Sequence, residues 1–306
     1  MLAQRSGAGV RVCAPAKLNL FFEVRSKRND GYHEIETLMV PVSLFDSLYL
    51  GDLAPPPSGV AAPVRLTCNP AFEPHCGMPA DAVPNGRDNL IVRALELLQI
   101  RAGTRHGAVV RLVKNIPTLA GLGGGSSDAA AALLAANKLW KLGWSIDQLA
   151  AVGAELGSDI PFFFAAGPAI CRGRGELVEP ICGLGDVHAV VVRPPQGLST
   201  ASVFAACQVP DQCRSVDRLA AALRGRKPKE IGRSLYNRLQ PAAETLSPWI
   251  GRIRREFDKL DCIAHQMTGS GTGYFGICHH ARHAARVAAL LRARSFGRIH
   301  VVRRAS

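Results

Sequence analysis

The chain has 306 residues, of which 47% are apolar and 20% charged, and its formal net charge at pH 7 is +13. This length suffices for about two domains with a sizeable core, and the composition is that of a soluble globular protein. No stretch approaches the length of a membrane span, and residues 1–13 lack the apolar core of a signal peptide, so we expect a cytoplasmic protein. The positive charge favours anionic partners, either nucleic acid or phosphorylated small molecules.

The nine cysteines are scattered, and no pair has the Cys-x-x-Cys spacing of a zinc knuckle or thioredoxin-type centre. His279 and His280 lie beside Cys278 without a matching second cluster, so we predict no metal site there. The arginines between residues 252 and 304 are spaced through amphipathic patterns, which are more typical of solvated helix faces than of a nucleic-acid-binding tail.

Two strands joined by a tight turn are predicted near the N-terminus. After Ala14-Pro15-Ala16, which we expect to interrupt a first strand, residues 17–24 alternate and place Lys17 and Asn19 on one surface. Asn29-Asp30-Gly31 is a strong hairpin signal, so Tyr32 and His33 should return near the strand of Lys17. Taken singly, a snorkelling lysine and surface packing of Tyr and His are the simpler interpretations.

Residues 51–87 are rich in Pro and Gly and predict a loop with one strand at 64–67. Asp88 is then expected to cap a helix that continues to Leu98.

A glycine-rich segment follows the predicted strand at 108–113 and precedes an Ala- and Leu-rich helix expected at 129–139, with Ser126, Ser127 and Asp128 in the N-cap region. Such a turn offers backbone N–H groups and the positive end of the helix dipole to an anion. It is not a Walker loop, because Ser126 rather than Lys follows Gly125. The alternative is a flexible turn before an ordinary helix. The predicted phosphate-binding residues are Pro117, Ala120, Gly121, Leu122, Gly123, Gly124, Gly125, Ser126 and Ser127.

Ser145 and Gln148 form a predicted capping box that opens a helix ending near Leu156. Asp159 follows in Gly-Ser-Asp-Ile-Pro, where an Asp is often only a turn or cap residue. A catalytic role for it needs support from elsewhere in the chain.

Residues 187–192 predict a buried strand, and helical patterns cover residues 201–206, 216–223, 249–260 and 280–294. Between them, residues 268–276 are again glycine-rich and match G-x-G-x-x-G. We reject a dinucleotide site, because residues 274–278 predict a strand where that motif requires a helix. Strands and helices mix irregularly in both halves, so we predict a two-domain α+β fold.

Three motifs in this order resemble those of the GHMP kinases, which include galactokinase, homoserine kinase and mevalonate kinase. They are Ala14 to Leu20, Pro117 to Ala129 and Thr268 to Gly276. Asp30-Gly31-Tyr32-His33, Gly157 to Pro161, Gly173-x-Gly175-Glu176 and Thr200-x-x-x-Phe204 further resemble the branch that phosphorylates the 2-hydroxyl of a cytidyl-diphospho-methylerythritol.

The resemblance implies a ribosomal-protein-S5-like N-terminal domain that binds ATP, residues 1–168, and a ferredoxin-like C-terminal domain, residues 169–306, that completes the substrate cleft. It implies ATP and Mg²⁺ as cofactors, Asp159 as the catalytic base and Lys17 as its cationic partner. A hydroxyl of Ser126 or Ser127 would reach the Mg²⁺. The implied substrate-binding residues are Asn19, Tyr32, His33, Thr200, Phe204, Gly269, Ser270 and Gly271.

Three other functions are compatible with parts of the sequence. A homoserine or mevalonate kinase would have no use for a cytosine-binding Tyr32-His33 pair. An RNA-binding module would need aromatic residues interleaved with Lys and Arg, but the aromatic content is only 6%. A non-catalytic sugar sensor would not need both Lys17 and Asp159. We therefore expect a small-molecule substrate, neither a nucleic-acid nor a membrane partner, and a monomer or weak homodimer.

Overall fold

The computed structural model describes residues 1–70, 83–84 and 86–305. Part of the predicted Pro- and Gly-rich loop, residues 71–82 and 85, therefore lies outside the described residues. The chain forms two compact units, each built from separated stretches: unit 1 comprises residues 1–16, 45–116 and 123–166, and unit 2 comprises residues 17–44, 117–122 and 167–306. The predicted domain boundary at residue 168 remains a prediction.

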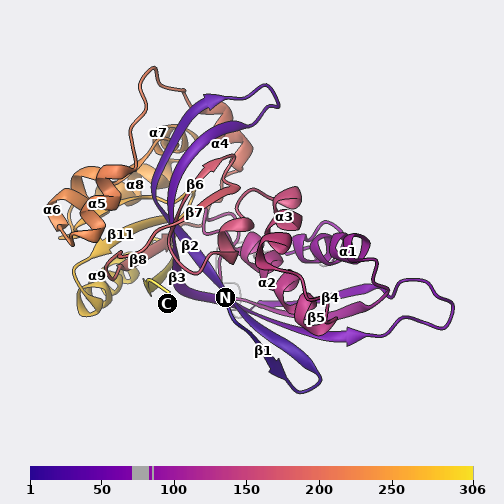
Figure 1. Cartoon of the computed structure of the whole chain (residues 1–306). Helices are drawn as coiled ribbons and strands as arrows, with labels where there is room; N and C mark the ends of the chain where they lie inside the picture. The colour runs from indigo at the N-terminus through magenta and orange to yellow at the C-terminus, as the bar shows by residue number, and fades with distance from the viewer. Residues whose placement is uncertain (71–82, 85, 306) are drawn as a thin grey trace. The chain divides into compact units, whose positions relative to one another are not determined.

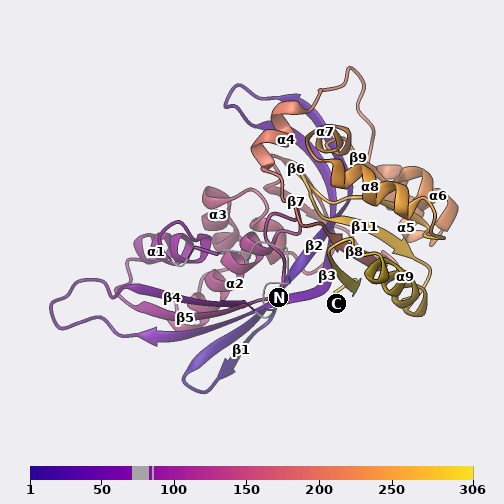
Figure 2. The same cartoon turned by 180° about the vertical axis from the view of Figure 1, so that it is seen from behind.

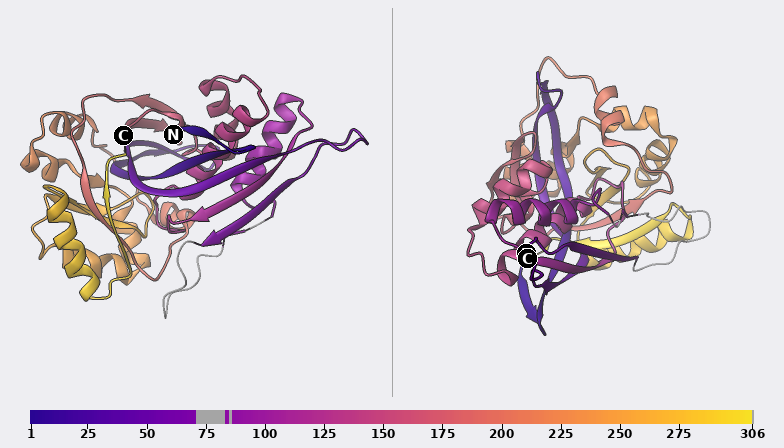
Figure 3. Two further views of the ribbon diagram at one scale, coloured as in Figure 1. Left: turned by 90° about the horizontal axis from the view of Figure 1, so that it is seen from below. Right: turned by 90° about the vertical axis from the view of Figure 1, so that its right-hand side faces the viewer.

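Unit 1 is a layer of helices on a β-sheet. Its strand order is β1-β2-β3-β5-β4, in which β2 and β3 contribute the parts that belong to this unit. Helices α1, α2 and α3 lie together on one face of these strands (Figures 1 and 2), as the left view of Figure 3 also shows. The strands and helices are β1 Ala3–Ser6, β2 Gly9–Lys27, β3 His33–Leu53, β4 Val64–Pro70, α1 Leu90–Ala102, β5 Gly107–Lys114, α2 Gly124–Leu139, α3 Ile146–Leu156 and the 3₁₀ helix η1 Pro161–Phe164.

Alanine makes the close packing in unit 1 possible. Six alanines of α2, at positions 129–132, 135 and 136, are fully buried, and α2 packs against both α1 and α3. Alanine combines the highest helix propensity with a small side chain, so neighbouring helices can approach closely. The predicted capping box of α3 is confirmed: Ser145 Oγ accepts from Gln148 N and Gln148 Oε1 accepts from Ser145 N.

Unit 2 contains the other halves of β2 and β3, in the strand order β9-β2-β3-β6-β7. The predicted hairpin turn is confirmed, because Arg28 N donates to Tyr32 O over 2.8 Å and Gly31 has a φ of 84° that favours glycine. Asp30 Oδ1 also accepts from Tyr32 N.

A second sheet of unit 2 has the order β10-β11-β8-β12 and is entirely antiparallel. Its core joins apolar residues of β2, β3, β8 and β11 with those of α7, α8 and α9. The remaining elements of unit 2 are β6 Ala169–Gly173, β7 Leu177–Pro180, β8 His188–Arg193, α4 Thr200–Ala206, α5 Asp217–Arg224, α6 Pro228–Ser234, β9 Tyr236–Asn237, α7 Gln240–Leu246, α8 Pro248–Phe257, β10 Ala264–Met267, β11 Tyr274–Cys278, α9 Ala281–Ala293 and β12 Arg298–Arg303.

Three local predictions were wrong. Pro15 does not interrupt β2, since the fixed φ of proline suits an extended strand and costs only the hydrogen bond that it cannot donate. Residues 14–24 are buried on both faces, so their alternation does not mark an exposed face. Asn89 rather than Asp88 caps α1, because its side chain accepts from Ile91 N.

Among the described residues, no helix is both long and apolar enough to span a membrane.

Candidate active site

Lys17 and Asn19 are buried neighbours on β2, with 3% and 1% of their surface exposed. Lys17 Nζ donates to Asn19 Oδ1. Asn19 also donates from Nδ2 to Thr37 Oγ1 over 2.8 Å and from its backbone N to Thr268 Oγ1 over 3.0 Å. The amide of Asn19 is thus largely used within the protein, and these contacts favour a role in orienting the Lys17 ammonium group.

The two predicted glycine-rich segments meet along their backbones in unit 2. Thr272 N donates to Leu119 O over 3.2 Å, and Gly273 N donates to Ala120 O over 3.1 Å. A Cβ atom at Gly121 would lie 2.1 Å from Thr268 O, so only glycine permits this approach. Lys17 N donates to Leu122 O over 2.9 Å, which ties the same loop to β2.

The second glycine segment also lies against the lysine. A Cβ atom at Gly269 would lie 3.2 Å from Lys17 Nζ, and Ser270 Oγ lies 2.9 Å from Thr200 Oγ1. Asn237, which the sequence analysis missed, donates from Nδ2 to the carbonyl oxygens of Met267 and Gly269 over 2.8 and 2.9 Å. No local motif marks Asn237, because its partners are about thirty residues away in the chain.

The N-terminus of α2, in unit 1, has the features of an anion site. The helix begins at Gly124, and its N-cap Gly123 adopts a φ of 69°. Ser127 N makes the first helical hydrogen bond, to Gly123 O over 2.9 Å. The N–H groups of residues 124–126 therefore have no acceptor within the helix, and they stand at the positive end of its dipole.

The predicted N-cap region at residues 126–128 was placed too late. The left-handed φ at the cap favours glycine, so the helix begins directly after Gly123 and takes both serines into its first turn. Ser126 is half-buried, whereas Ser127 is fully buried and its Oγ has no hydrogen-bond partner in the described part of the chain. Of the other residues predicted to bind phosphate, Pro117, Ala120 and Leu122 are buried and belong to unit 2.

A buried cluster of one ammonium and two carboxylate groups supports this helix start. Lys114 Nζ donates to Asp128 Oδ2 over 2.7 Å and to Asp46 Oδ2. Asp46 Oδ1 additionally accepts from the backbone N atoms of Asn115 and Ile116 over 2.6 and 2.8 Å. A Cβ atom at Gly124 would lie only 2.9 Å from Lys114 Nζ, so the cluster lies directly behind the loop.

The charges of this cluster do not balance. Burial raises the pKa of Asp128 well above its usual range, although the Lys114 ammonium opposes that shift. The two carboxylates raise the pKa of Lys114 despite its burial. Asp128 Oδ1 lacks a hydrogen-bond partner among the described residues, whereas Asp46 has three donors. Asp128 is therefore the carboxyl group that can take up a proton.

Asp159 lies half-buried in unit 1, in the turn between α3 and η1. The turn is closed by Ile160 N, which donates to Gly157 O over 3.2 Å. Both α3 and η1 pack on α2, the helix whose N-terminus is described above. The alternative that Asp159 is a turn residue is thus correct for its backbone, and its role as the catalytic base stays a prediction.

Aromatic residues gather at the hairpin end of unit 2. The ring centroids of His33 and Phe204 are 5.1 Å apart, and Tyr32 is 55% exposed with the Arg174 guanidinium 5.0 Å from its ring centroid. Burial, together with the charge of Lys27, lowers the pKa of His33, so its imidazole is neutral at pH 7. A neutral imidazole has one hydrogen-bond donor and one acceptor, which suits the edge of a nucleobase.

Two family models match the chain. Residues 89–167 match the N-terminal domain of the GHMP kinases, and residues 219–295 match their C-terminal domain. The chain belongs to the GHMP kinase family. It is 37% identical to the 4-diphosphocytidyl-2-C-methyl-D-erythritol kinase of Pelotomaculum thermopropionicum over 285 residues, which cover 92% of this chain and 94% of that protein. It is also 37% identical to the enzyme of the same name from Geobacillus thermodenitrificans, with 90% of each chain covered.

Comparison with solved structures confirms the predicted two-domain α+β fold of this family. A crystal structure of a 4-(cytidine 5'-diphospho)-2C-methyl-D-erythritol kinase matches with a TM-score of 0.75 and 34% identity, and the match covers 97% of this chain and all of that one. Homoserine kinase from Cytophaga hutchinsonii has the same TM-score of 0.75 but only 18% identity, with 100% and 97% covered. The second likeness shows the fold alone.

Proposed function

We propose that this chain transfers the γ-phosphoryl group of ATP to the 2-hydroxyl of 4-diphosphocytidyl-2-C-methyl-D-erythritol, a step in the non-mevalonate route to isoprenoid precursors. The observation that carries the proposal is the likeness to kinases of this name along nearly the whole length of both chains. The neutral His33 against Phe204, next to the exposed Tyr32, supports a cytosine-containing acceptor.

The phosphates of ATP would lie on the backbone N–H groups at the start of α2. Residues 124–126 offer these groups, and glycine at positions 123–125 leaves them accessible to a bulky phosphate. Mg²⁺ bound to the phosphates would neutralise charge during transfer. The half-buried hydroxyl of Ser126 fits such an ion better than that of the fully buried Ser127. In the described ranges, no group of three or more His, Cys, Asp or Glu could hold a metal ion.

Asp159 and Lys17 would be the catalytic residues for the transfer of the phosphoryl group. The acceptor oxygen forms a bond to the γ-phosphorus while the bond from that phosphorus to the bridging oxygen of ADP breaks. Asp159 would accept the proton of the attacking hydroxyl, which contributes about 10²–10⁴-fold to such reactions. The Lys17 ammonium, held by Asn19, would offset negative charge on the phosphoryl group and keep the carboxylate ionised.

The cytidyl part of the acceptor would bind at the hairpin end of unit 2. Tyr32 would stack on the cytosine, His33 would bond its edge, and Phe204 would form the second wall. The linked hydroxyl groups of Thr200 and Ser270, with Gly269 and Gly271 beside them, would contact the polar part of the substrate. Asn19 would act through Lys17. We further propose residues 1–168 as the ATP-binding domain, a cytoplasmic location, and a monomer or weak homodimer.

The test is ADP release from ATP with Mg²⁺ in the presence of four candidate partners: the cytidyl-diphospho acceptor, homoserine, mevalonate and an RNA oligomer. Release with the first alone is expected. Release with homoserine or mevalonate would move the chain to another branch of the family. RNA binding without ADP release would instead indicate a nucleic-acid-binding protein.

A further inference from the structure

A cavity of about 790 Å³ opens in unit 2 where helices α5 and α6 face strand β2. Its lining includes three arginines, Arg214, Arg218 and Arg233, together with Glu230 and the apolar residues Phe21 and Ala221. This volume lies within the range of about 300–1,000 Å³ that is typical of small-molecule pockets. None of the roles proposed above uses this cavity.

The cavity is strongly positive. Its one lining carboxylate, Glu230, is paired with Lys227 over 3.3 Å. Neither Arg218 nor Arg233 has an ion pair within the ranges that the structure describes, and both are exposed. Residues 211–238 contain eight Lys or Arg but only three Asp or Glu. Three guanidinium groups around one neutralised carboxylate attract an anion, and their planar donor forks match phosphate oxygens.

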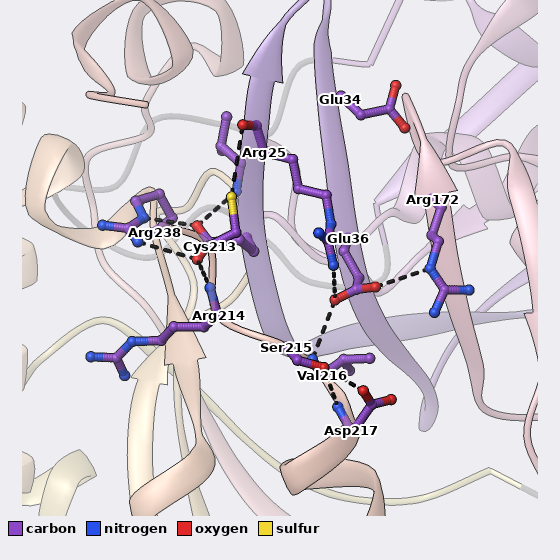
Figure 4. A network of polar contacts seen from close by, with 12 residues as sticks. Arg25, Glu34, Glu36, Arg172, Cys213, Arg214, Ser215, Val216, Asp217 and Arg238 are labelled. Atoms are coloured by element: carbon purple, nitrogen blue, oxygen red, sulfur yellow. Dashed lines mark hydrogen bonds and ion pairs between the residues drawn. The ribbon is translucent and has the colours of Figure 1, made fainter. Parts of the chain in front are cut away.

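The segment that carries Arg214 is fixed by hydrogen bonds to two buried glutamates, Glu23 and Glu36, of which Figure 4 labels Glu36. Glu36 Oε2 accepts from Val216 N over 3.2 Å, and Glu36 also pairs with Arg25 and Arg172. Figure 4 shows these side chains converging between the strands and residues 213–217. The lip of the cavity is therefore held in place before any ligand binds.

Both the backbone and the side chain of Arg214 have fixed partners. Glu23 Oε2 accepts from Arg214 N over 2.9 Å, and Glu23 in turn pairs with Arg238. The Arg214 guanidinium lies 4.2 Å from the ring centroid of Tyr236, a cation–π contact that orients it.

The cavity is separate from the aromatic pair at His33. Phe204 packs on His33 and, at 6.2 Å between ring centroids, on Phe22. The cavity is lined instead by Phe21, and successive side chains of a strand point to opposite faces. The arginines and the proposed cytosine site therefore lie on opposite sides of β2.

We propose that this cavity is a second ligand site, which binds a small phosphorylated organic molecule independently of catalysis. The phosphate would bind the guanidinium groups of Arg218 and Arg233, with Arg214 at the lip. The organic part would lie beside the exposed Ala221, over the floor of the cavity that the buried Phe21 forms with only 1% of its surface exposed. A half-open hollow of this size, rather than a flat basic stripe, favours a small molecule over nucleic acid.

Calorimetric titration with phenyl phosphate tests the proposal. The full-length chain is first saturated with Mg²⁺, a non-hydrolysable ATP analogue and the cytidyl acceptor, so that the proposed catalytic phosphate positions are filled. We expect one phenyl phosphate per chain with a Kd of about 1 mM or tighter. Inorganic phosphate should bind more weakly, because it lacks the apolar part. Equal affinities for phenyl phosphate and inorganic phosphate would indicate a site for free phosphate and contradict the proposal of an organic ligand.

Two variants with matched charge changes complete the test. Arg218→Gln combined with Arg233→Gln should raise the Kd for phenyl phosphate at least tenfold. Arg255→Gln on α8 combined with Arg282→Gln on α9 also removes two exposed arginines, but both lie outside the cavity lining, so this control should leave the Kd unchanged. Thermal unfolding confirms that the variants are folded. The proposal fails if the double variant binds like the wild type, if no phenyl phosphate binds, or if only anionic lipid vesicles bind.

Kinase turnover of the double variant separates this proposal from the proposed function. Turnover at saturating substrates should stay unchanged, since neither arginine has a catalytic role. A wild type without kinase activity would refute the proposed function and leave the calorimetric result standing. A double variant with reduced turnover would show that the cavity belongs to the catalytic site, which contradicts its independence.

Discussion

Replacing Lys114 by Met should destabilise unit 1 severely. The side chain of Lys114 is 6% exposed, and its ammonium is the only cation that the described contacts give to Asp46 and Asp128. Removing one partner of a buried ion pair costs about 3–5 kcal/mol, because the remaining charge stays buried without compensation. Here Asp128 can take up a proton, since its pKa is already raised, so we expect about 3 kcal/mol, the lower end of that range.

The loss should depend on pH in a defined direction. A carboxyl group whose pKa is raised in the folded state binds more protons in the folded protein than in the unfolded one. The free energy of unfolding therefore falls as pH rises. The ordinary pKa of Asp is about 3.9, and the decline should therefore begin near that pH and continue up to the raised pKa of Asp128. Without the lysine, the pKa of Asp128 rises further, so this decline should continue to higher pH, and the gap in unfolding free energy between wild type and Lys114→Met should be wider at pH 8 than at pH 5.

Urea unfolding at these two pH values, followed by tryptophan fluorescence, measures the gap. Trp140 is a suitable probe because it is buried in unit 1 and donates from Nε1 to Gly107 O. Asp128→Asn is the matched control: it keeps the Lys114–Asp46 pair and should cost about 1 kcal/mol or less. A loss below about 1 kcal/mol for Lys114→Met at pH 8, or a gap that does not widen with pH, would refute the reasoning.

Three further predictions concern the proposed catalytic and substrate residues. Asp159→Asn should lower kcat by about 10²–10⁴-fold while calorimetry still detects ATP binding, and near-normal kcat would remove Asp159 from the base role. Tyr32→Ala should raise the KM for the cytidyl acceptor roughly 5- to 150-fold through the loss of about 1–3 kcal/mol of stacking, with the KM for ATP unchanged. Ile100→Ala, which truncates another exposed apolar residue, is its control, and equal effects on both KM values would argue against stacking. The acceptor KM should stay flat from pH 8 to about 6.5 and rise below as His33 protonates, and a rise already between pH 8 and 7 would contradict a neutral His33.

Contiguous motifs were the most predictable part of the molecule. The strand Tyr274–Cys278 after the second glycine segment is confirmed, and with it the rejection of a dinucleotide site. The hairpin at Asp30 and Gly31 and the capping box of α3 are also confirmed. The hairpin and the capping box depend on hydrogen bonds between residues within four positions of one another, so a short stretch of sequence is enough to predict them.

Contacts between distant residues could not be predicted in this way. Lys114 and Asp46 are 68 positions apart, and neither neighbourhood indicates a buried ion pair. Glu23 and Glu36 look like ordinary strand charges, but the packing of residues 213–217 over them makes them buried acceptors for backbone N–H groups. The start of α2 was misplaced for a related reason: the backbone conformation at Gly123 prevailed over the capping preference of serine.

Phosphorus NMR can follow the proposed phosphorylation of the cytidyl-diphospho acceptor on its alcohol in a mixture of the purified chain, ATP, Mg²⁺ and this acceptor. We expect a new phosphate-monoester signal that grows in equal amount with ADP, while the diphosphate signals of the acceptor persist. Growth of inorganic phosphate alone, or ADP formation without a monoester signal, would contradict the proposed phosphorylation.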